Sequence, residues 1–153
     1  MKILCKAVLD ALRDKTLATA ESCTGGMIGS FLTAVPGSSR VYKGGIISYT
    51  NEVKEELLGV PGDILETFGA VSEPVAMAMA QGALARLHAD VAVSVTGLAG
   101  PDGDEFGNPV GLVYLGYADD KQTVTRECHF SGDRESVRKQ AVDAALKLIL
   151  EMQ

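Results

Sequence analysis

The segment DVAVSVTG, residues 90–97, is a short run rich in β-branched residues, with an aspartate at its start and a glycine at its end. Such a run is typical of a strand that is buried on both faces. Strands of this kind occur where helices cover both sides of a sheet. The segment therefore predicts an α/β architecture for the chain around it.

Strand patterns lie on both sides of this segment. Two apolar runs precede it, LATA at residues 17–20 and GGIISYT at residues 44–50. Two more follow it, GLVYLGYA at residues 111–118 and TVTRECHF at residues 123–130, with a polar turn between them. This last pair predicts an antiparallel hairpin.

Helical patterns alternate with these strands. Leu4, Val8 and Leu12 recur at helical spacing before the first strand, and Met27, Phe31 and Leu32 do so after it. Three further helices are predicted, one capped by Asn51 and ended by Gly59 and Pro61, one from Ser72 to about Leu87, and one capped by Asp133.

Alternating strands and helices followed by one hairpin predict a single three-layer α/β/α sandwich with a mixed, about five-stranded sheet. The chain has 153 residues and is 46% hydrophobic, which is enough for one domain with a substantial core. No linker or internal repeat interrupts it. We therefore expect residues 1–153 to form one domain.

Composition excludes several classes of function. The net charge is −6, so no global basic field attracts nucleic acid. No apolar run approaches the roughly 18 residues of a membrane span, and we expect no signal peptide or membrane anchor. The three cysteines, at positions 5, 23 and 128, suit a reducing cytoplasm and no disulfide framework. No Cys or His pair has zinc-type spacing, so no metal site is predicted.

Two possible nucleophiles, Ser22 and Cys23, stand together in ESCTGG, residues 21–26, between an expected strand and helix. A glycine-rich turn at this place points free backbone N–H groups at one spot, which can bind a phosphate or an oxyanion. The same pattern is typical of a simple helix cap by Ser22 or Thr24. In α/β sheets, ligands collect beyond the carboxyl ends of the parallel strands, so this turn, residues 48–54 and residues 96–109 should converge.

A nucleophile needs a base, and neither histidine is well placed for that role. His88 is expected at a helix end and His129 on the polar face of a hairpin strand. Lys54, about one turn into a helix, and Tyr49, at a strand end, can reach the same sheet edge as Ser22. Lys54 would need a lowered pKa to act as a base. Taken alone, each is more typical of a solvated lysine and of an aromatic at a strand end.

Motifs along nearly the whole chain resemble one known family. ATAESCTGG (residues 18–26), GIISYTNEVK (residues 45–54), TGLAGPDG (residues 96–103) and FSGDRESVR (residues 130–138) occur in order, with VPGSS, LLGV, GAVSE and PVGLVY between them. In these motifs the chain resembles the C-terminal domain of the CinA (competence/damage-inducible) proteins. The resemblance implies a three-layer α/β/α fold with a mixed five-stranded sheet, in agreement with the pattern above.

Stand-alone members of that family include nicotinamide mononucleotide deamidases. The resemblance therefore implies a nicotinamide-nucleotide amidase that forms nicotinate mononucleotide and ammonia, with no metal and no cofactor. It implies Ser22 as nucleophile, Lys54 as the base and Tyr49 as an assistant in the proton relay. It also implies substrate binding by the following residues: Thr24, Gly25 and Gly26 through their N–H groups, and Thr96, Gly97 and Ala99 in a second loop. Together with the frequency of two-fold symmetry, it predicts a homodimer.

The substrate's phosphate requires a local cation in a protein of charge −6. Arg134 and Arg138 lie four apart on one helical face near the helix start, and Arg40 is a third candidate. Surface pairing of these arginines with neighbouring acids is an equally good interpretation. Cys23 is expected to point away from the cleft and to pack as a small buried residue.

The chain departs from the family pattern at Asp104 and Asn108, where many members carry a glycine pair and a lysine nearby. An extra acid beside a loop that faces an anionic substrate would weaken binding. A second hypothesis therefore stands beside the enzyme: a catalytically silent relative that binds a phosphorylated ligand or a protein partner.

Overall fold

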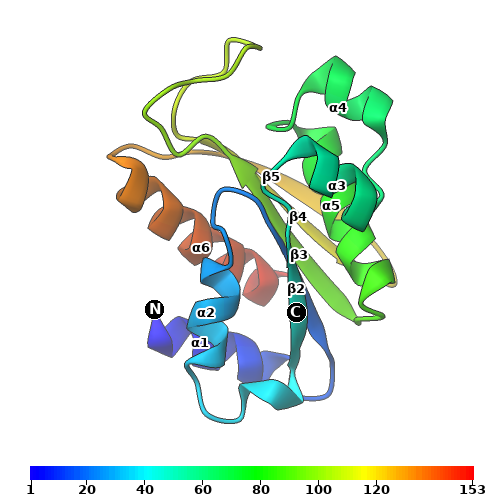
Figure 1. Cartoon of the computed structure of the whole chain (residues 1–153). Helices are drawn as coiled ribbons and strands as arrows, with labels where there is room; N and C mark the ends of the chain where they lie inside the picture. Colours follow the sequence, from blue (N-terminus) through cyan, green and yellow to red (C-terminus); the bar gives the residue numbers. More distant parts are fainter.

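The computed structural model describes the whole chain, residues 1–153, as three layers around a five-stranded sheet (Figure 1). The strand order is β2–β1–β3–β4–β5. β1 pairs in parallel with β2 and β3, and the pairs β3–β4 and β4–β5 are antiparallel. The mixed five-stranded sheet is therefore confirmed. The strands are β1 (Leu17–Glu21), β2 (Tyr42–Ile47), β3 (Val91–Gly97), β4 (Leu112–Asp119) and β5 (Thr123–His129).

Helices cover both faces of the sheet, as expected for a three-layer sandwich (Figure 1). One face carries α1 (Lys2–Ala11), α2 (Met27–Thr33) and α6 (Arg134–Glu151). The other face carries α3 (Asn51–Leu58), α4 (Gly62–Phe68) and α5 (Glu73–Arg86). A short 3₁₀ turn, Ser38–Arg40, leads into β2. None of the helices is both long enough and apolar enough to span a bilayer.

The central strand β3 contributes to the cores on both faces, which confirms the interpretation of residues 90–97. Val91, Val93 and Val95 pack in the larger core with α1, α2 and α6, whereas Ala92 packs in the smaller core with α3, α4 and α5. Gly116 of β4 lies directly under α5, where an added Cβ would stand 2.4 Å from the Ala76 carbonyl oxygen. Small residues thus let α5 lie close against the sheet, with its start near the carboxyl end of β3.

Three local expectations were wrong. β2 ends at Ile47, so Tyr49 follows the strand and does not end it. Thr50, not Asn51, caps α3, because its side chain accepts a hydrogen bond from the Val53 N–H at 3.3 Å. The helix α4 was not predicted, since seven residues that begin with Gly62 after a proline present only a weak helical pattern.

The parallel strands β1, β2 and β3 all end at one edge of the sheet. The segments that follow them are residues 22–26, 48–50 and 98–111. These segments meet there, because the carboxyl ends of parallel strands lie at the same edge of an α/β sheet. The sheet therefore brings three loops that are far apart in the sequence together at one edge.

Candidate active site

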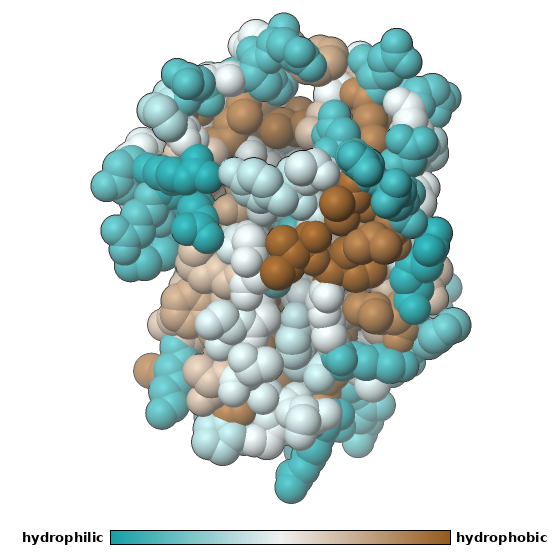
Figure 2. Space-filling view, viewed as in Figure 1, coloured by the Kyte–Doolittle hydropathy of each residue, from teal (hydrophilic) through white to brown (hydrophobic).

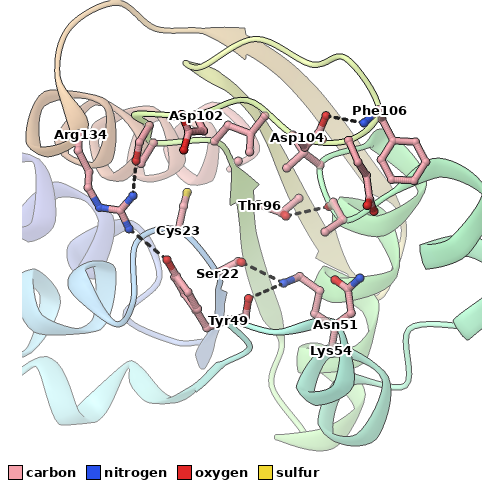
Figure 3. Close-up of a pocket in the computed structure, with 17 residues that line it drawn as sticks. Ser22, Cys23, Tyr49, Asn51, Lys54, Thr96, Asp102, Asp104, Phe106 and Arg134 are labelled. Carbon is pink, nitrogen blue, oxygen red and sulfur yellow. Dashed lines mark hydrogen bonds between the residues drawn. The ribbon is translucent and has the colours of Figure 1, made fainter.

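A cavity of about 320 Å³ lies where these three loops meet (Figure 3). Figure 2 shows the surface hollowed between the long loop and α4, with hydrophobic residues inside and hydrophilic residues around the rim. The residues that line the cavity come from all three loops, from the start of α3, from the segment before α5 and from α6. They are Ser22, Cys23, Tyr49, Asn51, Lys54, Ala70, Val71, Thr96, Gly97, Leu98, Ala99, Gly100, Asp102, Asp104, Glu105, Phe106 and Arg134.

Ser22 and Lys54 are in direct contact inside this cavity. Lys54 Nζ donates a hydrogen bond to Ser22 Oγ at 3.0 Å (Figure 3). The same ammonium donates to the backbone carbonyl oxygens of Ser48 at 2.7 Å and Tyr49 at 3.4 Å. The predicted proximity of Ser22 and Lys54 is thus confirmed, although they are 32 residues apart in the chain.

Burial changes the acid–base character of Lys54. The residue is 1% exposed, although it lies in a helix that otherwise has mostly exposed polar side chains. Desolvation lowers the pKa of its ammonium to about 8, against an ordinary value of 10.5. No carboxylate forms a salt bridge with Lys54. A lysine with this pKa, in contact with a hydroxyl, can exchange a proton with it near neutral pH.

Tyr49 occupies the rim of the cavity. Its side chain is 60% exposed, and its hydroxyl accepts a hydrogen bond from an Arg134 guanidinium nitrogen at 3.1 Å (Figure 3). Arg134 also donates to the Gly100 carbonyl oxygen and so joins two of the three loops. Lys54 contacts Ser22 directly and reaches Tyr49 only at its backbone, so a proton relay through the Tyr49 hydroxyl is not required.

The anion site predicted at the start of α2 is already filled by the protein's own Glu21. Its carboxylate is 2% exposed and accepts from the N–H groups of Ile28 at 2.9 Å and Gly29 at 3.1 Å. It also accepts from the hydroxyls of Thr24 at 2.8 Å and Thr19 at 3.2 Å. A substrate phosphate therefore has no access to this helix N-terminus.

The glycine pair serves the turn and lies outside the cavity lining. Gly25 and Gly26 both have positive φ, +57° and +102°, which favours glycine at each position. The Gly25 N–H donates to the Ser22 carbonyl oxygen at 3.1 Å, so it is not a free donor. The N–H groups of Cys23, Thr24 and Gly26 form no hydrogen bond in the structure, and of these three residues only Cys23 lines the cavity.

The two predicted arginines have different positions. Arg134 lines the cavity, whereas Arg138 does not. The Arg138 guanidinium donates to the carbonyl oxygens of Cys23 at 2.9 Å and Thr24 at 3.2 Å, on the back of the turn. Arg40 borders a separate groove beside α1 and does not line this cavity. Of the three candidates, only Arg134 is placed to meet a ligand here.

Cys23 is buried and packs in the larger core, as expected. The expectation that it points away from the cleft was wrong, because it also lines the cavity (Figure 3). Burial raises the pKa of its thiol to about 11 and outweighs the lowering effect of its own backbone N–H and of the charges of Arg138 and Lys54. A protonated thiol is a weak nucleophile, so the electrostatics favour Ser22 over its neighbour.

The end of β3 and the loop after it form the opposite wall, which contains the residues that the sequence predicted there, Thr96 and Gly97 in the strand and Ala99 in the loop. The Thr96 hydroxyl donates to the Ala70 carbonyl oxygen at 2.8 Å. Sequence reasoning missed Asp102, Glu105 and Phe106, which lie on the exposed part of this wall. It also missed Val71, a buried apolar residue of the GAVSE segment that lines the same cavity.

Asp104, the residue that departs from the family pattern, organises the loop. Its carboxylate accepts from the N–H groups of Phe106 and Asn108, each at 3.0 Å, and from the Asn108 side-chain amide at 2.8 Å. Asp104 and Asn108, the two residues that depart from the family pattern, are thus hydrogen-bonded to each other. Much of the acceptor capacity of the extra acid is used within the loop.

Comparisons with known proteins identify the family of the chain. The family model described as the CinA C-terminal domain matches residues 2–153. The putative competence-damage inducible protein of Desulforamulus reducens is 48% identical over 133 residues, which are 87% of this chain and 32% of that protein. The CinA-like protein of Gemmatimonas aurantiaca is 48% identical over 136 residues, 89% of this chain and 32% of that protein. The chain thus spans about a third of the length of the curated relatives it matches.

Solved structures match over nearly their full length. The crystal structure of a CinA superfamily protein from Escherichia coli has a TM-score of 0.97 at 39% identity and covers 99% of this chain and 90% of that chain. The crystal structure of the competence damage-inducible protein A from Klebsiella pneumoniae has a TM-score of 0.96 at 38% identity and covers 98% of this chain and 94% of that chain. The chain therefore belongs to the CinA C-terminal domain family.

Proposed function

We propose that this member of the CinA family is an amidohydrolase that converts nicotinamide mononucleotide and water to nicotinate mononucleotide and ammonia. The observation that carries the proposal is the 3.0 Å contact between Ser22 Oγ and the buried Nζ of Lys54 inside the cavity. A hydroxyl beside a lysine of lowered pKa is the arrangement that serine–lysine acyl transfer requires. The choice of substrate rests on the family resemblance and on the charges of the cavity.

In the first half of the proposed reaction, Ser22 Oγ attacks the carboxamide carbon. Neutral Lys54 accepts the hydroxyl proton as the new C–O bond forms. Lys54 then donates this proton to the amide nitrogen, the C–N bond breaks, and ammonia leaves. The product is an ester between the nicotinoyl group and Ser22.

In the second half, a water molecule takes the place of ammonia. Lys54 accepts a proton from the water, whose oxygen attacks the ester carbon. The bond to Ser22 Oγ breaks, the serine recovers its proton from Lys54, and the carboxylate product leaves. The sum is one amide and one water consumed for one acid and one ammonia formed.

Both tetrahedral intermediates carry an oxyanion, and the N–H groups of Cys23 and Thr24 are the proposed donors to it. They belong to the first and second residues after Ser22, and neither is engaged in another hydrogen bond. Removing one such donor commonly costs about 10² to 10³ in rate. This set adds Cys23, which lines the cavity, to the residues Thr24–Gly26 expected from the sequence. It leaves out Gly25, whose N–H is already bonded, and Gly26, which lies beyond it in the turn.

The cavity offers charges of both signs, which suits a nucleotide with a cationic ring. Nicotinamide mononucleotide carries a positive pyridinium and a negative phosphate. Arg134 is the cation at the rim, and the carboxylates of Asp102 and Glu105 stand exposed on the loop beside the half-exposed ring of Phe106. We propose that Arg134, oriented by Tyr49, receives the phosphate and that the acidic loop faces the ring. A volume of about 320 Å³ is within the usual range for small-molecule sites.

The test is ammonia release from nicotinamide mononucleotide by the purified protein. Ser22→Ala should lower the rate by about 10⁴-fold or more, because it removes the nucleophile. Cys23→Ala is the matched control at the next position, and it should keep most of the activity because the backbone N–H is unchanged. Loss of activity in Cys23→Ala alone would contradict the assignment. An inactive unmutated protein that still binds the nucleotide would favour the silent, ligand-binding alternative.

A further inference from the structure

We propose that Glu21 and Arg138 are positioning residues that clamp the nucleophile turn, residues 22–26, from two sides. The proposal rests on the proposed function, because what the clamp positions is Ser22 together with the two oxyanion donors. Neither side chain lines the cavity, so neither is placed to touch the substrate. Each acts on the reaction only through the backbone that it holds.

Glu21 holds the side of the turn that leads into α2. Its two carboxylate oxygens accept the N–H groups of Ile28 and Gly29 at the first turn of that helix, which an ordinary helix leaves without a partner. Oε1 also accepts the Thr24 hydroxyl from within the turn. The side chain that directly precedes Ser22 is thereby tied to the helix that directly follows the turn.

Glu21 also ties the turn to the segment that carries the base. Its backbone carbonyl oxygen accepts from the Ser48 N–H at 2.8 Å. The carbonyl oxygen of the same Ser48 accepts from Lys54 Nζ at 2.7 Å. A shift of Glu21 would therefore move Ser22 and the Lys54 contact together.

Arg138 holds the opposite side of the turn by its carbonyl groups. The guanidinium binds the carbonyl oxygens of Cys23 and Thr24 from α6, more than a hundred residues away in the chain. In a planar trans peptide, the carbonyl and the following N–H point in opposite directions. Fixing the Cys23 carbonyl toward Arg138 therefore directs the Thr24 N–H, one of the proposed oxyanion donors, away from α6.

Charged side chains on both sides make this turn stiffer than a neutral cap would. Hydrogen bonds to ionised groups are shorter and stronger than those between neutral groups. The glycines at positions 25 and 26 have positive φ, and without the clamp they would leave the turn free to adopt other conformations. The clamp confines this pair to one conformation.

Two substitutions test the clamp with nicotinamide mononucleotide as substrate. Glu21→Gln puts an N–H₂ group against backbone N–H donors, and Arg138→Met keeps the length of the side chain but removes its donors. We expect each to lower kcat by about 10²-fold, the scale of a misplacement near 1 Å. KM should stay within about threefold, since ground-state binding is not touched. Arg138→Lys, which can still reach one carbonyl, should recover part of the loss.

Matched controls separate positioning from general destabilisation. Tyr117→Phe removes partly buried hydrogen bonds with Asp119 and Gln153 away from the cavity, and Arg126→Met removes an exposed arginine paired with Glu151. Both should keep kcat and KM near the unmutated values, even where Tyr117→Phe lowers the melting temperature as much as the clamp variants do. Equal losses of kcat in Tyr117→Phe would overturn the proposal.

Amide hydrogen exchange tests the clamp without reference to catalysis. Exchange should become faster in residues 22–29 of Glu21→Gln and Arg138→Met, and it should stay unchanged in β3 and β4. Unchanged exchange in residues 22–29 overturns the clamp, and so does faster exchange with unchanged kcat. If the unmutated protein released no ammonia, the proposed function would fail, whereas faster exchange confined to this segment would still support the clamp.

Discussion

The two walls of the cavity differ in how firmly they are built. The nucleophile turn is held by Glu21 on one side and Arg138 on the other, and its residues from Glu21 to Thr24 are buried. The opposite wall, the loop of residues 98–111, is exposed along most of its length. The difference suggests a separation of tasks, in which the buried wall performs the chemistry and the exposed wall selects the substrate.

The exposed wall is nevertheless ordered at its base and its tip. The Gly111 N–H donates to the Leu98 carbonyl oxygen at 2.7 Å, which closes the base. Asp104 binds the backbone of residues 106 and 108 at the tip. Between these points Asp102 and Glu105 face the cavity, are exposed and belong to neither core, so they can change without disturbing the packing. We therefore expect substitutions on the two walls to affect different kinetic constants.

Lys54→Met should give the largest effect and should fall on kcat. The substitution keeps an unbranched side chain of similar length but removes the base, so kcat should fall by about 10³-fold or more. Steady-state ammonia release measures this loss, and circular dichroism checks that the variant is folded. Activity within tenfold of the unmutated protein would remove the lysine from the mechanism.

Arg134→Met should act on KM instead. Losing a charged hydrogen-bond donor to the phosphate should raise KM for nicotinamide mononucleotide by about 10- to 100-fold, with kcat little changed. Nicotinamide riboside, which lacks the phosphate, is the matched substrate. Its KM should be similar in variant and unmutated protein. An equal rise for both substrates would mean that Arg134 supports the fold of the rim and does not bind phosphate.

The pH profile should report the base on the buried wall. Because burial lowers the pKa of Lys54 to about 8 and the proposed mechanism uses its neutral form, kcat/KM should rise with pH through that value. The gain between pH 7 and pH 9 should be about tenfold for a single titrating base. Arg134→Met should keep the inflection of the pH profile near pH 8, because Arg134 lies at the rim of the cavity and does not contact Lys54. A rate that falls as pH rises through 8 would require a protonated lysine and a different mechanism.

Asp104→Ala should give the smallest effect. The loop tip loses three hydrogen bonds, so we expect a rise in KM of about three- to tenfold, with kcat and the melting temperature nearly unchanged. Asp119→Ala is the matched control, because Asp119 binds two backbone N–H groups in the turn between β4 and β5 in the same way. It should leave KM unaltered. A large loss of kcat in Asp104→Ala would break the distinction between the two walls.

Much of this fold is predictable from periodicity and caps. The β-branched segment at residues 90–97 and the side-chain cap at Asp133 both have the predicted structure. The boundary of β2 and the helix α4 are not predictable in this way. Short elements depend on tertiary contacts more than on local pattern, as the buried Leu65 of α4 illustrates.

The sequence predicts the contact between Ser22 and Lys54, but it does not predict the partners of Glu21 and Arg138. The contact of Ser22 with Lys54 follows from strands that end at one edge of the sheet. The positions of Glu21 and Arg138 do not, because sequence spacing cannot tell which way a charged side chain turns. The sequence predicts an anion site at the turn and a phosphate ligand at Arg138. In the structure, Glu21 and Arg138 instead form hydrogen bonds with the protein's own backbone. The one sequence signal for the role of Glu21 is its position directly before the glycine-rich turn.

The central claim is that an acyl group passes through Ser22 on the buried wall, and trapping with hydroxylamine tests it most directly. An acyl-enzyme formed from nicotinamide mononucleotide should transfer its nicotinoyl group to hydroxylamine, so that mass spectrometry detects the hydroxamate. We predict that the unmutated protein and Cys23→Ala form it and that Ser22→Ala does not. Ammonia release without any hydroxamate, or hydroxamate that depends on Cys23 and not on Ser22, would contradict the account.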